Sequence, residues 1–205
     1  KRNFSPNQIT ILSGLFGIAT CFLIAFNTKN NRLLAFVFIQ LFATLDLVDG
    51  FLARKKGIAS KFGQWLDIFF DKLIEVSLLA SITYTSYVKN ENIDSLIIGS
   101  TLIIFHLLIQ YLMIINQLHF QKEKKNTSSK ILQKASNKAF SLRSLIINII
   151  RFIELHLTLK HSTLLLVSSF FVLTNQHFIG LYVLLFISFY TLLLMCFYNF
   201  YLIKD

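Results

Sequence analysis

The sequence predicts an all-α, polytopic membrane protein with six transmembrane helices. Of its 205 residues, 55% are hydrophobic, only 15% are charged and one is proline, and the mean hydropathy is +0.62. A soluble domain would carry about 25% charged residues. The apolar residues also occur in long blocks, and a run of roughly 20 such residues is long enough to cross a bilayer as a helix.

Six blocks meet this length, and together we expect them to form a single membrane domain over residues 1–205. The expected spans are residues 9–27, 33–52, 62–87, 93–119, 145–174 and 178–203. The fifth differs from the others because Arg151, Glu154, His156 and Lys160 interrupt its first half. This half is either part of the span or an interfacial helix that leads into a shorter span.

The positive charge is distributed unevenly between the two sides of the predicted membrane. With the N-terminus inside, the outer connections hold only Lys29, Arg32 and Lys89, whereas the inner segments hold most of the other lysines and arginines. Cytoplasmic loops carry such an excess, so we expect both termini to be cytoplasmic, in a prokaryotic cell membrane. The net charge of +10 then suits anionic lipid headgroups, and we expect no nucleic-acid partner.

Four carboxylates interrupt the second and third predicted spans: Asp46, Asp49, Asp67 and Asp71. Ionisable groups in membrane helices are costly and usually functional. Spacings of three and four residues place each pair on one helix face, and a tight turn at 57–60 would bring the pairs together. Hard oxygen ligands favour Mg²⁺, Mn²⁺ or Ca²⁺, and paired ions stabilise phosphoryl-type displacements. The sequence therefore predicts an active site at the cytoplasmic end of these spans.

The carboxylates belong to a longer pattern, D-x2-D-G-x2-A-R-x8-G-x3-D-x3-D, which runs from Asp46 to Asp71. At every fixed position it resembles the signature of the CDP-alcohol phosphotransferase family, also called the CDP-alcohol phosphatidyltransferase family. The resemblance extends to the whole chain, because family members have six spans with this motif running from the second into the third. The segment Pro6-Asn7-Gln8-Ile9-Thr10 also resembles the family's start of the first span.

This resemblance implies a reaction and a set of roles. Family members transfer a substituted phosphate from a CDP-linked donor to an alcohol hydroxyl and release CMP, using two divalent ions (Mg²⁺ or Mn²⁺), and form homodimers. By analogy Asp46, Asp49 and Asp67 hold the metals. Asp71 completes the metal site and acts as the catalytic general base. The implied CDP-binding residues are Gly50, Ala53, Arg54 and Gly63.

The membrane setting suggests a lipid donor, most simply CDP-diacylglycerol or an archaeal ether counterpart. The acceptor would then be a small polar alcohol, phosphorylated in the case of glycerol 3-phosphate or inositol phosphate. An anionic acceptor needs cations, for which Lys138, Arg143 and Arg151 are the candidates, although Arg151 could equally pair with Glu154. Lys72, next to Asp71 as in phosphatidylglycerophosphate-synthase-like members, favours an anionic acceptor. The alternative is a CDP-choline or CDP-ethanolamine phosphotransferase with a diacylglycerol acceptor.

Several of these residues also have simpler interpretations. Acidic pairs in membrane helices occur in cation transporters, and Arg54 alone could be a snorkelling interface residue. Glu75, one turn beyond Asp71, either reaches the site or pairs locally with Lys72. The histidines show no metal-ligand spacing, and we expect them to have packing or interface roles; they are His106, His119, His156, His161 and His177.

Overall fold

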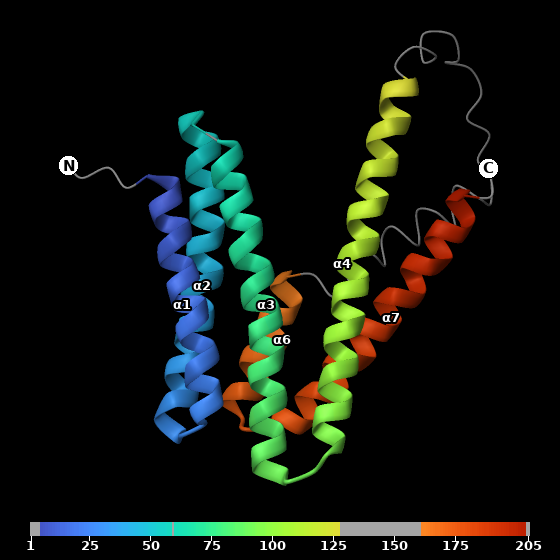
Figure 1. The fold of residues 1–205 in the computed structure, drawn as a ribbon. Coiled ribbons are helices and arrows are strands. Elements are labelled where there is room, and N and C mark those ends of the chain that lie inside the picture. The colour runs from blue at the N-terminus through green and yellow to red at the C-terminus, as the bar shows by residue number, and fades with distance from the viewer. Residues whose placement is uncertain (1–4, 59, 128–160, 204–205) are drawn as a thin grey trace. The chain divides into compact units, whose positions relative to one another are not determined.

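The computed structural model describes residues 5–58, 60–127 and 161–203, and within these residues the secondary structure is entirely helical (Figure 1). The all-α prediction is therefore confirmed. The helices are α1 (Pro6–Phe26), α2 (Lys29–Lys56), α3 (Lys61–Asn90), α4 (Asp94–Thr127), α6 (His161–Leu173) and α7 (His177–Ile203).

Four of the described helices are long and apolar enough to cross a membrane: α1, α2, α4 and α7. Helix α3 has 30 residues, but its first half carries Asp67, Asp71, Lys72 and Glu75. Helix α6 is an apolar helix of 13 residues, and the first half of the predicted fifth span lies outside the described residues. The chain is thus a helical membrane protein, and the acidic residues that weaken α3 as a span are the ones that form the candidate site.

Local sequence signals explain where the first helices begin and end. Ser5 and Gln8 form a capping box at the start of α1, in which each side chain accepts a hydrogen bond from the other residue's backbone N–H. Between α2 and α3, Gly57 adopts a left-handed conformation with φ 65°, which glycine allows without steric cost. Ser60 then caps α3 by accepting a hydrogen bond from the Gly63 backbone N–H at 2.9 Å. The predicted tight turn at 57–60 is thus supported by Gly57 and Ser60, while residue 59 lies outside the described residues.

The chain divides into two compact units, and the candidate site belongs entirely to the first, which includes residues 1–103 and 159–185. In this unit α1 packs against α2 and α3, and α6 packs against α2 and α3. Its buried core includes Ile24, Phe42 and Leu78. At Gly17 an added Cβ would lie 2.3 Å from Ile74 Cδ1, so the missing side chain lets α1 approach α3 closely.

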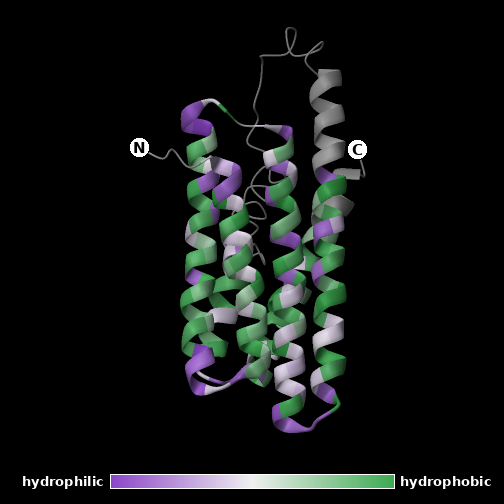
Figure 2. Ribbon diagram, turned by 60° about the vertical axis from the view of Figure 1, so that its left-hand side comes forward, coloured by the Kyte–Doolittle hydropathy of each residue, from purple (hydrophilic) through white to green (hydrophobic). Residues whose placement is uncertain are grey.

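Large apolar side chains on the outer faces of the helices suit a lipid environment. Phe26 and Leu47 are each 73% exposed, and Phe22 is 63% exposed. Figure 2 shows apolar residues along the length of the helices and hydrophilic residues gathered at their ends. Exposed apolar surface of this extent indicates contact with membrane or protein, as expected for a membrane protein.

Candidate functional site

The four motif carboxylates come together in the helical hairpin of α2 and α3, as the sequence predicts. Ligand oxygens of Asp46, Asp49 and Asp67 all lie within 4.8 Å of one another. A second group shares Asp46 and adds Asp71 and the imidazole of His161, again with ligand atoms within 4.8 Å. Asp46 therefore lies in both groups, and the arrangement could hold two adjacent cations that share one carboxylate.

Asp49 is the most deeply buried of these carboxylates, and a residue of α1 holds it. Asp49 is 4% exposed, and its Oδ2 accepts a hydrogen bond from the Thr10 hydroxyl. The same hydroxyl also contacts the Pro6 carbonyl oxygen at 3.1 Å. Thr10 comes from the Pro6–Thr10 segment that resembles the family's start of the first span. This segment therefore orients a carboxylate of the Asp46–Asp71 pattern.

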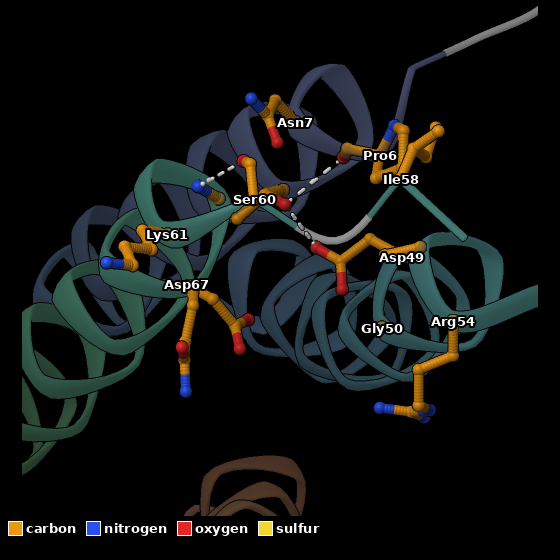
Figure 3. Close-up of a pocket in the computed structure, with 13 residues that line it drawn as sticks. Pro6, Asn7, Asp49, Gly50, Arg54, Ile58, Ser60, Lys61 and Asp67 are labelled. Carbon is orange, nitrogen blue, oxygen red and sulfur yellow. Dashed lines mark hydrogen bonds between the residues drawn. The ribbon is translucent and has the colours of Figure 1, made fainter. Parts of the chain in front are cut away.

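A cavity of about 450 Å³ opens beside Asp49 and Asp67 at the α2–α3 turn. Figure 3 shows Asp49 on α2 and Asp67 on α3 turned toward the same space, with Asn7 of α1 at its edge. All four residues implied in CDP binding line this cavity. Its lining is Pro6, Asn7, Thr10, Asp49, Gly50, Ala53, Arg54, Ile58, Ser60, Lys61, Gly63, Gln64 and Asp67.

The two motif glycines leave room for neighbouring side chains at the cavity. A Cβ added at Gly50 would lie 3.3 Å from Arg54 Nη1, so the guanidinium group lies back along α2 over Gly50. A Cβ added at Gly63 would lie 2.7 Å from Asn7 Oδ1. Small residues at these positions keep Arg54 and Asn7 at the wall of the cavity, where they can contact a bound phosphate or polar group.

A hydrogen-bonded chain of side chains adjoins Asp71. The buried Glu75 accepts a hydrogen bond from Lys72 Nζ at 2.8 Å through Oε2, and its Oε1 lies 2.8 Å from His161 Nδ1. On the other side of the ring, His161 Nε2 lies 3.8 Å from Asp71 Oδ1. Glu75 thus does both things that the sequence left open: it pairs with Lys72 and it reaches the site.

His161 is the site residue that the sequence did not single out. We expected packing roles for the histidines because their spacing shows no ligand pattern, yet α6 brings this ring to the carboxylates. It also packs edge-on against the buried Phe42 of α2, with ring centroids 5.6 Å apart. The only sequence signal was a polar residue between a charged segment and an apolar run. The acceptor-binding candidates Lys138, Arg143 and Arg151 lie outside the described residues.

Comparisons with known proteins agree with the motif. Residues 3–173 match the sequence profile of the CDP-alcohol phosphatidyltransferase family. An archaetidylinositol phosphate synthase of Pyrococcus horikoshii is 34% identical over 99 residues, which cover 48% of this chain and 51% of that protein. A phosphatidylinositol phosphate synthase of Corynebacterium glutamicum is 32% identical over 84 residues, 41% of this chain and 37% of that protein.

A third relative is a bifunctional IPC transferase and DIPP synthase of Aquifex aeolicus, which is 32% identical over 79 residues. The match covers 38% of this chain and 18% of that protein. The chain thus matches about half the length, or less, of these curated relatives.

Proposed function

Because the chain belongs to the CDP-alcohol phosphatidyltransferase family, we propose that it transfers a substituted phosphate from a CDP-linked lipid to the hydroxyl of an inositol phosphate. CMP is the second product. The observation that carries this proposal is the cavity next to the carboxylates, which is lined by Gly50, Ala53, Arg54 and Gly63. The four residues implied in CDP binding thus line the same cavity as Asp49 and Asp67, two of the proposed metal ligands.

The donor set of the site fits divalent cations. Both candidate positions are rich in carboxylate oxygens, the ligands preferred by Mg²⁺ and Mn²⁺. Asp71 Oδ1 is buried and has no hydrogen-bond partner among the described residues, and a buried carboxylate oxygen of this kind needs a compensating positive charge. Two bound ions would neutralise negative charge that develops on the pyrophosphate as CMP departs.

The remaining steps belong to the chain's own residues. The cavity holds the cytidine diphosphate group, with Arg54 and Lys61 as its lining cations. Asp71 takes the proton of the acceptor hydroxyl. The freed oxygen attacks the phosphorus that bears the lipid, and the bond from that phosphorus to the bridging oxygen breaks. The electron pair of this bond leaves with CMP, and the lipid phosphate is now esterified to the acceptor.

The acceptor proposal rests on two observations of different kinds. Two relatives are named archaetidylinositol phosphate synthase and phosphatidylinositol phosphate synthase. In the sequence, Lys138, Arg143 and Arg151 precede or enter the fifth expected span, where they would suit an anionic acceptor. These matches do not favour the choline or ethanolamine phosphotransferase alternative. We further propose that both termini are cytoplasmic and that the protein is a homodimer in a prokaryotic membrane.

The test is CMP release by the purified protein with Mg²⁺ or Mn²⁺. CDP-diacylglycerol and its archaeal ether counterpart serve as donors, with inositol phosphate, glycerol 3-phosphate, inositol and serine as acceptors. We expect metal-dependent CMP release with inositol phosphate and little with unphosphorylated inositol. Preference for CDP-choline and diacylglycerol would overturn the proposal that the lipid is the CDP-linked donor. Preference for glycerol 3-phosphate over inositol phosphate would overturn the proposed acceptor.

Removing the hydroxyl of Thr10 should weaken cation binding without removing a ligand. In Thr10→Val the Asp49 carboxylate loses the hydrogen bond that orients it, and loss of such a supporting contact typically costs about 10- to 100-fold in metal affinity. We expect the Mn²⁺ concentration for half-maximal CMP release to rise about 10-fold.

Thr20→Val is the matched control for this prediction. Thr20 lies on the same helix, is 1% exposed, and donates a hydrogen bond to the Phe16 carbonyl at 2.9 Å; the Thr10 hydroxyl likewise contacts the carbonyl four residues earlier. It touches no carboxylate of the site among the described contacts, so its Mn²⁺ dependence should match the wild type. Equal Mn²⁺ dependence in the two variants would contradict the role of Thr10.

A further inference from the structure

The ring of His161 is held by groups on two other helices. Its Nδ1 lies 2.8 Å from Oε1 of Glu75, a residue that is fully buried and is itself paired with Lys72 at 2.8 Å. The rings of Phe42 and His161 pack edge-on, with their planes at 74° to one another. Since Glu75 offers carboxylate oxygens, Nδ1 donates this hydrogen bond, and the neutral ring then presents a lone pair at Nε2.

The other ring nitrogen, Nε2, lies close to a carboxylate of the site. It is 3.8 Å from Asp71 Oδ1, a separation too long for a hydrogen bond. Both atoms are buried, and neither has a hydrogen-bond partner among the described residues. Two acceptor atoms that face one another in a buried site are unfavourable unless a positive charge lies between them.

The surroundings of His161 match those of a metal-ligating histidine. Such a histidine nearly always donates its second ring N–H to a carboxylate or carbonyl, which fixes the tautomer and orients the ring. Here Glu75 supplies that carboxylate, and ligand atoms of Asp46, Asp71 and His161 lie within 4.8 Å of one another. His161 thus lies where a ligand is expected, although it is outside the family motif and comes from another helix.

We propose that His161 Nε2 is a nitrogen ligand at one of the two cation positions, together with Asp46 and Asp71. The other position, with Asp46, Asp49 and Asp67, is then all-oxygen. This inference rests on the proposed function, because it concerns the same pair of ions. It makes the two positions chemically different: imidazole suits transition metals, whereas carboxylate-only sites suit Mg²⁺ and Ca²⁺.

The consequence is a metal preference that depends on one residue. The His161 position should take Mn²⁺ in preference to Mg²⁺, since Mg²⁺ binds nitrogen ligands poorly. We expect His161→Gln to lower the Mn²⁺-over-Mg²⁺ preference by about 10-fold. Glu75→Gln should keep the nitrogen ligand but weaken Mn²⁺ binding by about 10- to 100-fold, as loss of the orienting carboxylate does at other histidine-ligated sites.

The decisive experiment detects the nitrogen directly. The full chain, purified without nucleotide, is loaded with Mn²⁺ and studied by pulsed electron paramagnetic resonance, which reports ¹⁴N nuclei bonded to the ion. We expect ¹⁴N coupling that changes to ¹⁵N coupling when the histidines alone are ¹⁵N-labelled. The coupling should disappear in His161→Gln and persist in His177→Gln.

His177→Gln is a matched control because that histidine is buried and its Nε2, like Nδ1 of His161, lies near a side-chain oxygen, 3.2 Å from Oδ1 of Asn27. Wild-type protein that binds Mn²⁺ in a manner abolished by Asp46→Asn, but shows no histidine nitrogen coupling, would overturn the ligand role and leave the proposed metal site standing. Coupling that persists in His161→Gln would assign the ligand to another histidine and would also overturn it. No Asp46-dependent Mn²⁺ binding would overturn the metal site as well.

Discussion

Asp46→Asn should lower CMP release by about 1000-fold or more. Asp46 is the residue common to both groups of potential ligands. Its substitution therefore removes negative charge from both cation positions, whereas Asp49→Asn affects only one. The loss should appear with either Mg²⁺ or Mn²⁺, and the number of tightly bound Mn²⁺ ions should fall, as titration of the purified variant would measure.

Asp94→Asn provides the control for charge removal. Asp94 is an exposed acidic residue at the start of α4, and its Oδ2 accepts a hydrogen bond from Asn92 at 3.1 Å. The Asp94→Asn change removes one carboxylate charge at a position outside the Asp46–Asp71 pattern. It should leave CMP release unaltered. If Asp46→Asn retained more than a tenth of wild-type turnover, the shared-ligand role would be wrong.

The fold could be predicted because the length of an apolar run is enough to identify a membrane helix. Helices α1, α3 and α7 begin and end within a few residues of the predicted spans. Helix α2 continues to Lys56, beyond the apolar run, since its last turn carries cations that favour a helix C-terminus. Helix α4 similarly extends to Thr127, because apolar patterning does not report where a polar helix stops.

The candidate site was predictable where its residues share one hairpin. Asp46, Asp49, Asp67 and Asp71 lie on two helices joined by a short turn, so spacing and the turn at Gly57 are enough to bring them together. Thr10 and His161 reach the same site from α1 and α6, and only tertiary packing decides that. Glu75 could be placed on the correct face of α3, but its partner on α6 could not be read from the sequence.

Asp71→Asn should reduce turnover by about 100- to 10,000-fold, the range expected for loss of a general base. Asparagine keeps the size of the side chain but cannot accept the hydroxyl proton. The variant should still bind the CDP-linked donor, because Asp46, Asp49 and Asp67 form a ligand group without Asp71 and the cavity lining does not include it.

Comparing two measurements separates the base role of Asp71 from a purely structural one. Donor affinity, measured by protection of the purified protein against thermal unfolding with a CDP-lipid, should change little, while CMP release at saturating donor and acceptor falls. The control is Asp49→Asn, which alters a cavity-lining carboxylate and should weaken donor binding. Asp71 Oδ1 is buried beside His161, and Asp71 is not among the residues that line the cavity, so its substitution should leave the cavity wall unchanged. Full turnover in Asp71→Asn would show that another group takes the proton.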